Sequence, residues 1–257
     1  MRIAVIGAGG VGGYFGALLA RAGHEVTFVA RGAHLAAIQQ HGLRVESTLD
    51  GAFIVTGRAV GDTTQAGPQD LVLFTVKMYD NAAALAATKP LLRDDTIVLT
   101  LQNGIDNGEQ LAAVYGAPRI MIGSAYMEGR IQEPGVVTQA GPGAAAFGEM
   151  TPGITPRAQR LLGVLREAGW RVELHDNMPG MLWKKFAYIA GSAAVCAATN
   201  SDYQEMRSIP ETRAIIQGAI EEVLAVGRAR GAPILADSLN WSSAVIDQVS
   251  ESARIGA

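Results

Sequence analysis

The sequence has few of the features that mark secreted, membrane or metal-binding proteins. Cys196 is its single cysteine, which excludes an internal disulfide framework and favours a reducing compartment. Its four histidines show no metal-ligand spacing, so no metal site is expected. The N-terminal apolar stretch is interrupted by glycines, and the stretch 186–198 has 13 residues where a bilayer needs about 20. We therefore expect a cytoplasmic protein.

Charge is also unremarkable in amount and sign. Twenty-one Lys and Arg residues against 24 Asp and Glu residues give a net charge of -3, which argues against nucleic acid or an anionic membrane as the main partner. No Ser-His-Asp nucleophile motif is present. A chain of 257 residues is long enough for one large domain or two modest ones, each with its own core.

The first two-thirds of the chain alternates short β-branched runs with helical patterns, which predicts an α/β fold with a doubly wound, Rossmann-type sheet. The predicted strands are Ile3–Ile6, Glu25–Val29, Leu71–Val76, Thr96–Leu101 and Arg119–Ser124. The predicted helices between them are Gly12–Arg21, His34–Gln40, Asn81–Thr88 and Asn107–Val114.

Two further segments of this part resemble hairpins. Residues 42–60 hold two apolar runs around Asp50-Gly51, and residues 129–150 have turn signals at Pro134-Gly135 and Gly141-Pro142-Gly143. We therefore expect antiparallel additions to the parallel sheet.

After Asn177 the pattern becomes helical throughout. Residues 178–200 and 211–231 both show helical spacing, and no convincing strand follows them. These patterns predict a domain of residues 1–176 and an all-helical domain of residues 177–257, which could serve substrate binding and dimerisation. The sequence stops inside a helical pattern, so we expect the second domain to be incomplete.

A glycine motif follows the first predicted strand. Gly7, Gly9 and Gly12 form G-x-G-x-x-G, in which the glycines serve a tight turn, close approach of the backbone to a pyrophosphate, and close packing of helix on strand. The helix N-terminus that follows offers free N–H groups to phosphate. Gly10 and Val11 lie in the same loop, and we expect them to contact the cofactor as well.

Arg31 indicates which dinucleotide binds. NAD sites usually carry an acidic residue about 20 residues after the glycines to hold the ribose hydroxyls, but this chain has Ala30-Arg31 there. A guanidinium pairs with a 2′-phosphate that a carboxylate would repel, so NADP(H) is favoured over NAD and FAD. The alternative is that Arg31 is an ordinary solvated arginine.

Two polar residues follow the later strands, whose carboxyl ends border the ligand crevice of such sheets. Lys77 is a candidate for a cofactor phosphate or ribose, and Asn103 for the nicotinamide side. The structural alternatives are a solvated loop lysine and a turn-forming asparagine before Gly104. His34 is a further candidate for contact with the cofactor phosphate.

The helix predicted after residue 178 offers a proton donor. Lys185, Ile189, Ser192 and Cys196 share one helical face, and a lysine in an apolar cleft is shifted toward neutrality, as suits a general acid. Reduction of a carbonyl by hydride needs such a donor. Spacing alone does not decide between Lys184 and Lys185, and both could simply be snorkelling at a helix start.

Together these motifs resemble the ketopantoate reductase (2-dehydropantoate 2-reductase) family. The resemblance rests on "IAVIGAGGVGGYFGALLARAGHEVTFVARG", "DLVLFTVKMYDN", "LQNGIDNGEQL" and "HDNMPGMLWKKFAYIAG", in order from Met1 to about Pro233. It implies an NADPH site in a cleft between a Rossmann domain and a helical domain. It also implies reduction of ketopantoate to pantoate, on the route to pantothenate and coenzyme A.

The resemblance also implies roles for single residues. Arg31 and Lys77 would meet the cofactor phosphates, Asn103 would lie between cofactor and substrate, and Lys185 would be the general acid of the "LW-x-K" motif. In the family, asparagines follow this lysine by four and eight residues and hold substrate, whereas Ile189 and Ala193 stand at those positions here. Ser192 is a candidate replacement.

Those departures leave three functions open. The first is NADPH-dependent reduction of ketopantoate, and the second is reduction of a different, more apolar 2-oxo acid by a related hydroxyacid dehydrogenase. The third is a non-catalytic NADP(H)-binding protein. The family continues beyond the point where this sequence ends, and that segment supplies a serine and a glutamate to which no residue here is assigned.

Overall fold

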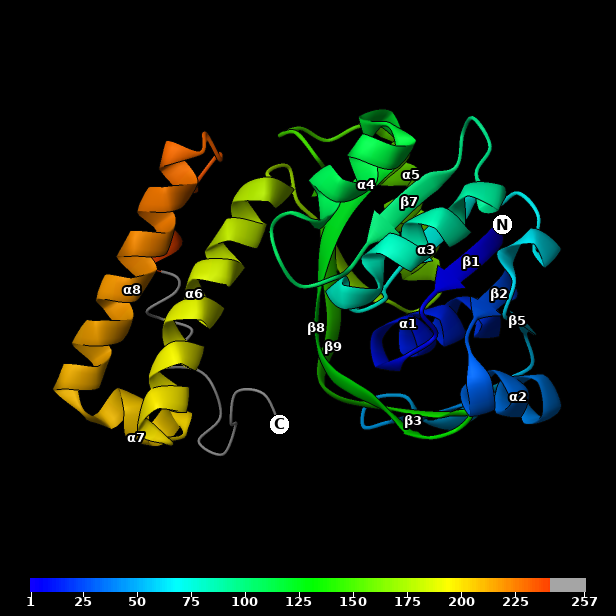
Figure 1. Cartoon of the computed structure of the whole chain (residues 1–257), viewed down its shortest axis with the longest axis horizontal. Coiled ribbons are helices and arrows are strands. Elements are labelled where there is room, and N and C mark those ends of the chain that lie inside the picture. Colours follow the sequence, from blue (N-terminus) through cyan, green and yellow to red (C-terminus); the bar gives the residue numbers. More distant parts are fainter. Residues whose placement is uncertain (241–257) are drawn as a thin grey trace. The chain divides into compact units, whose positions relative to one another are not determined.

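A computed structural model describes residues 1–240, without the side chains of residues 203, 204 and 207 (Figure 1). The chain forms two compact units, one from Met1 to Met178 and one from Pro179 onward. The first unit holds a mixed sheet with helices, and the second is helical in its described part. The predicted fold class, a Rossmann-type sheet with antiparallel additions followed by helices, is thereby confirmed.

The first unit contains ten strands in the described residues, joined in one sheet. They are β1 (Arg2–Ile6), β2 (Glu25–Val29), β3 (Leu43–Ser47), β4 (Gly51–Val55), β5 (Arg58–Val60), β6 (Leu71–Phe74), β7 (Ile97–Thr100), β8 (Ile120–Glu133), β9 (Val136–Glu149) and β10 (Arg171–Leu174). The helices are α1 (Gly10–Arg21), α2 (Gly32–His41), α3 (Asn81–Thr88), α4 (Asn107–Tyr115) and α5 (Pro156–Glu167), with short 3-10 turns η1 (Thr63–Gln65), η2 (Met78–Asp80), η3 (Lys89–Leu91) and η4 (Ala117–Arg119).

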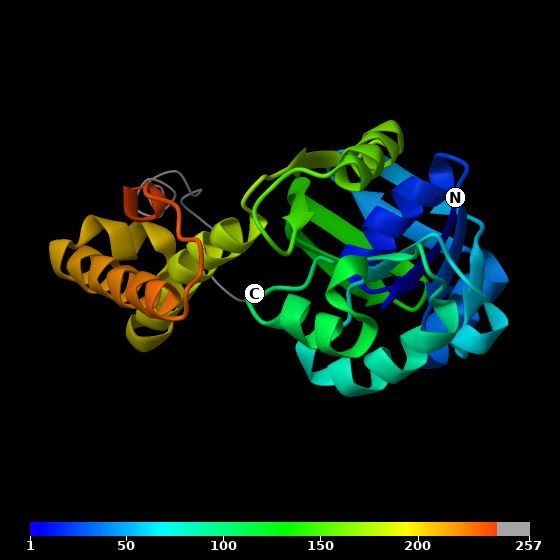
Figure 2. The same ribbon diagram turned by 90° about the horizontal axis from the view of Figure 1, so that it is seen from above.

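The order of the strands shows where the chain connections change direction along the sheet. The sheet runs β4-β3-β9-β8-β7-β6-β1-β2-β5, and β1 pairs in parallel with both β2 and β6. The connections therefore reverse direction at β1, and Figure 2 shows α1 and α5 on one face of the sheet and α3 and α4 on the other. In open α/β sheets, ligands bind beyond the carboxyl ends of the strands at such a switch point.

The antiparallel additions lie beyond β7. β8 and β9 form a long antiparallel pair that turns at Pro134-Gly135, and β3 and β4 form a hairpin at Asp50-Gly51, as predicted. The turn predicted at Gly141-Pro142-Gly143 is wrong, because these residues lie within β9. The pairing shifts between Tyr126–Ala144 and Glu128–Ala140, so the three residues form a bulge opposite Met127, with positive φ at both glycines.

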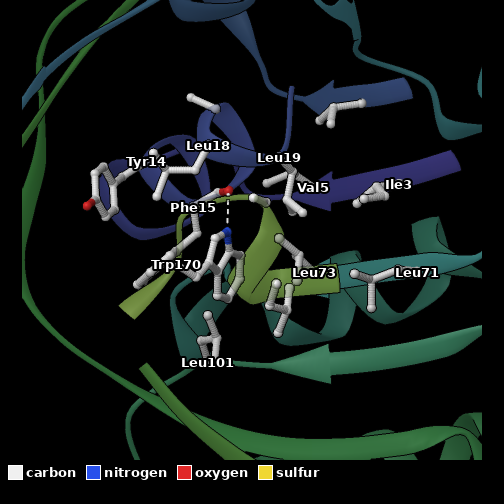
Figure 3. Packing of buried hydrophobic residues seen from close by; sticks show 14 of the residues in the cluster. Ile3, Val5, Tyr14, Phe15, Leu18, Leu19, Leu71, Leu73, Leu101 and Trp170 are labelled. Atoms are coloured by element: carbon white, nitrogen blue, oxygen red, sulfur yellow. Dashed lines mark hydrogen bonds between the residues drawn. The ribbon is translucent and has the colours of Figure 1, made fainter. Parts of the chain in front are cut away.

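The core of the first unit lies between α1, α5 and the sheet. Apolar side chains of β1 and β6 meet Leu18 and Leu19 of α1, and each of these side chains is fully buried (Figure 3). Trp170 packs against Phe15 with the rings tilted by 40° and 4.3 Å between their centroids, and its indole N–H donates to the Phe15 carbonyl at 3.1 Å. This packing anchors α1, whose N-terminus begins at the glycine motif.

The second unit contains α6 (Met178–Thr199, which starts at the unit boundary), α7 (Tyr203–Ser208) and α8 (Pro210–Ala229). α6 and α8 lie side by side (Figures 1 and 2) and share a core of Ala187, Val195, Cys196, Met206, Ile216, Ile220 and Leu224. None of the helices within residues 1–240 is both long and apolar enough to span a bilayer.

Candidate active site

The glycine loop connects β1 to α1 at the switch point of the sheet. Gly7 has a φ of +95°, which side-chain-bearing residues rarely adopt, and a Cβ there would lie 2.8 Å from the Val76 amide nitrogen. A Cβ on Gly12 would overlap the Thr75 hydroxyl and the Gly7 carbonyl. The first and third glycines therefore serve the turn and the close packing of helix on strand.

Gly9 differs from its neighbours because its surface is open. A Cβ at Gly9 would meet no other atom within 4 Å, and no side chain caps the start of α1. The N-terminus of α1 therefore keeps backbone N–H groups for a ligand. A Cβ on Gly10, in contrast, would overlap the backbone of Gly129 in β8, so Gly10 allows α1 and β8 to pack closely. Val11 is half-buried and packs against the core.

Arg31 precedes α2, two residues after β2 ends. Its side chain is 69% exposed, and its guanidinium lies 3.6 Å from the carboxylate of Asp80 at the end of η2. β2 and β6, from which these loops emerge, both pair with β1. Arg31 thus lies on the glycine-loop edge of the sheet, with an acidic partner that sequence reasoning missed.

Lys77 and Asn103 are both exposed in loops on the same edge. Lys77 precedes η2 after β6, and Asn103 follows β7, which pairs in parallel with β6. The structure therefore brings both residues to the edge that carries Gly9 and Arg31, as parallel strand order requires. Their roles toward a cofactor stay predictions.

A buried network of amide side chains holds these two loops. Gln102 donates to the Val76 carbonyl at 2.6 Å and to the Asn81 carbonyl oxygen at 2.8 Å, and Asn107 donates to the Asn103 carbonyl at 2.8 Å. Asn81 donates to Asn107 at 3.3 Å, which closes the network. Asn81 and Asn107 are the first residues of α3 and α4, but no local sequence pattern predicted that they would meet.

His34 supports the glycine loop from α2. One ring nitrogen, Nε2, lies 2.8 Å from the Ala8 carbonyl oxygen, and the other, Nδ1, accepts from the Gly135 amide at 3.0 Å. Because a carbonyl only accepts, Nε2 is the donor to Ala8, while Nδ1 is the acceptor from Gly135. The imidazole thus links the glycine loop to the turn between β8 and β9, and both ring nitrogens are engaged with backbone.

These features fit a dinucleotide. The unfilled space above Gly9 and the uncapped start of α1 suit a pyrophosphate, since both expose backbone N–H groups to an anion. Arg31 and Lys77 add exposed cations at the same edge. Within residues 1–240, no group of three His, Cys, Asp or Glu side chains is placed to hold a metal ion.

The two adjacent lysines of α6, in the second unit, differ in their environments. The Lys184 side chain is 5% exposed, and its Nζ donates to Asp237 Oδ2 at 2.9 Å. Burial lowers the pKa of Lys185 from 10.5 to about 8. An ion-paired lysine serves structure, whereas a lysine of lowered pKa suits proton transfer, so the distinction favours Lys185 as the proton donor.

The residues after Lys185 on α6 are mostly apolar. Ile189 and Ala193 are half-buried, whereas Ser192 is fully buried and donates to the Tyr188 carbonyl at 2.6 Å. This bond within the helix is typical of a structural serine. The structure therefore gives Ser192 a partner other than substrate, and its role in substrate binding stays a prediction.

Comparison with known proteins agrees with this geometry. The 2-dehydropantoate 2-reductase of Pyrococcus horikoshii is 35% identical over 186 residues, which are 72% of this chain and 60% of that protein. The 2-dehydropantoate 2-reductase of Mesorhizobium japonicum is 29% identical in an alignment 252 residues long, gaps included, that covers 90% of this chain and 77% of that protein. The chain thus spans three-fifths to three-quarters of the length of these relatives.

Solved structures share the fold of this chain. A PanE/ApbA family ketopantoate reductase from Ralstonia eutropha superposes with a TM-score of 0.87 at 32% identity, over 99% of this chain and 83% of that chain. The 2-dehydropantoate 2-reductase of Porphyromonas gingivalis superposes with a TM-score of 0.88 at 29% identity, over 97% of this chain and 89% of that chain. D-mandelate dehydrogenase, solved with NADH and anilino(oxo)acetate, shares the fold at 22% identity and a TM-score of 0.87, over 100% and 82%.

Family profiles match both units of the chain. Residues 3–152 match the family described as Ketopantoate reductase PanE/ApbA, and residues 177–254 match its C-terminal domain. Because these segments cover far more than half of its length, the chain belongs to the ketopantoate reductase family.

Proposed function

We propose that the protein is an oxidoreductase that uses NADP(H) to reduce the 2-oxo group of a small 2-oxo acid, with 2-dehydropantoate as the first substrate to test. The observation that carries this proposal is the open space above Gly9 at the start of α1, with the Arg31 guanidinium on the same edge of the sheet. Family membership supports the reaction class.

Different residues of the chain would carry the separate parts of the proposed reaction. Bound NADPH supplies the hydride that the carbonyl carbon receives. The N-terminus of α1 holds the pyrophosphate, Arg31 and Lys77 pair with the phosphates, and Asn103 orients the nicotinamide side. The Lys185 ammonium donates a proton to the carbonyl oxygen as that oxygen gains charge. Its pKa of about 8 leaves Lys185 mostly protonated at neutral pH, yet makes it a stronger acid than an ordinary lysine.

A second candidate differs only in substrate. Ile189 and Ala193 stand one and two turns beyond Lys185 and offer no hydrogen bond to a substrate hydroxyl. Sites that lack such partners lose most of their preference for the hydroxylated substrate. This observation favours a more apolar 2-oxo acid. A panel of 2-oxo acids that vary in hydroxylation, assayed with NADPH, separates the two candidates by their kcat/KM values.

Arg31→Ala tests the cofactor assignment. We expect a KM for NADPH at least about tenfold higher and a KM for NADH nearly unchanged, because the guanidinium would pair with a 2′-phosphate that NADH lacks. Arg44→Ala is the matched control, since Arg44 is also an exposed arginine of the first unit with an acidic partner, Glu46, at 2.8 Å. Equal effects on both cofactors would refute the role of Arg31. Cofactor binding with no turnover across the panel would favour a non-catalytic protein.

A further inference from the structure

The ion pair between Arg31 and Asp80 joins two loops that flank the glycine loop. Arg31 follows β2 and Asp80 follows β6, on the two sides of β1. The guanidinium and the carboxylate lie 3.6 Å apart, and the Asp80 side chain is 36% exposed. Although Asp80 directly precedes α3, its side chain makes no capping hydrogen bond to that helix. The ion-pair partner of Asp80 is therefore Arg31, the residue on which the proposed preference for NADP(H) rests.

A carboxylate at this place acts on the two cofactors in opposite directions. A 2′-phosphate of NADP(H) bound to Arg31 would share the guanidinium with Asp80 and would be repelled by its charge. The ribose of NAD(H) carries a hydroxyl there instead, and a carboxylate near a ribose hydroxyl accepts its hydrogen bond. Asp80 of η2 would thus take the place of the acidic residue that dinucleotide sites usually carry after β2.

On this basis we propose that Asp80 is a specificity-determining residue, which reduces the preference for NADP(H) over NAD(H) that Arg31 creates. This proposal rests on the proposed use of NADP(H), and both residues that it concerns, Arg31 and Asp80, belong to the first unit. It goes beyond the proposed reaction because it concerns the ratio of the affinities for NADP(H) and NAD(H). Removing the charge of Asp80 while keeping its shape should therefore sharpen the selectivity.

Titration calorimetry with NADP⁺ and NAD⁺ tests this inference without turnover. In Asp80→Asn, we expect the ratio of the NAD⁺ Kd to the NADP⁺ Kd to rise roughly three- to tenfold, as suits one partly screened charge near a phosphate. Asp80→Ser should change the ratio in the same direction. The control is Asp94→Asn, which removes an exposed partner of Arg119 at 3.7 Å, in the loop before β7 and thus at the opposite edge of the sheet.

The outcomes separate the two proposals. An NADP⁺-binding wild type whose Asp80→Asn ratio stays within twofold, or shifts toward NAD⁺, overturns the role of Asp80 and leaves the proposed function standing. A wild type that binds neither nucleotide overturns both. A ratio that rises in Asp80→Asn and not in Asp94→Asn supports the inference.

Discussion

Lys185 offers the sharpest test of the proposed chemistry, because one property of its side chain determines both activity and stability. Burial lowers the pKa of its ammonium to about 8. In the proposed reaction the ammonium form donates the proton, so the rate of reduction should fall as pH rises through about 8. Oxidation of the 2-hydroxy acid needs the neutral amine as base, so its rate should rise through the same pH.

The lowering of the Lys185 pKa from 10.5 to about 8 also gives the free-energy cost of keeping this lysine charged in the folded protein. At about 1.4 kcal/mol per pKa unit, the folded protein holds the charged lysine at a cost on the order of 3 kcal/mol. Between about pH 8 and pH 10.5 the unfolded chain binds more protons at this site than the folded chain does, so the Lys185 contribution to stability rises with pH. Lys185→Met should therefore abolish turnover and raise the free energy of unfolding at pH 7 by up to that amount.

Two measurements check these expectations. Initial rates of NADPH oxidation from about pH 6 to about pH 10 should fall about tenfold per pH unit above pH 8. Denaturant unfolding at pH 7 should show greater stability for Lys185→Met than for the wild type. Lys185→Arg is the control, since it keeps the charge but does not titrate in this range, and it should be inactive throughout. A reduction rate that stays level to pH 9.5, or a destabilised Lys185→Met, would contradict the assignment.

Two further predictions concern the glycine loop and the neighbouring lysine. Gly9→Ala should keep the melting temperature, because its Cβ meets only open space, yet weaken NADP⁺ binding in calorimetry, whereas Gly10→Ala should lower the melting temperature through overlap with β8. The reverse pattern would disprove this division of roles. Asp237→Asn should destabilise the fold by about 1 kcal/mol or less in denaturant unfolding, because it removes the charge that pairs with the Lys184 ammonium, and solvent screens that charge on a side chain that is 64% exposed. Since the hydrogen bond from Lys184 lowers the pKa of Asp237, the wild-type advantage should vanish as pH falls below the ordinary carboxyl range; an advantage that persists there would exclude this cause.

Local patterns predicted β1, β2, β6, β7 and helices α1 to α4 to within two residues at each end, because apolar periodicity and glycine turns act over short distances, whereas the strand predicted at Arg119–Ser124 continues to Glu133 in β8. These local patterns were misleading where pairing between strands decided the structure. Gly141-Pro142-Gly143 has the composition of a turn, but β8 pairs on both sides of it and holds it as a bulge. Helix α5 and strand β10 were not predicted, and β10 pairs with β9, which is distant in the sequence.

For the candidate site, the glycine motif and the position of Arg31 could be recognised in the sequence, because the strand, the turn and the helix that carry them follow one another directly. Asp80 carried no such signal, since its significance arises only when β2 and β6 pair with β1 and their loops meet. The amides of Gln102 and Asn81 are similar, because they are separated in sequence and joined by burial.

The sequence by itself determined the order of elements, the dinucleotide loop and the two lysines at the start of α6, since these depend on neighbouring residues. Only the tertiary structure decided which lysine is paired with Asp237 and which has a lowered pKa, and which carboxylate faces Arg31. Solvation and charge pairing depend on distances between segments far apart in the chain, and those distances exist only once the chain has folded.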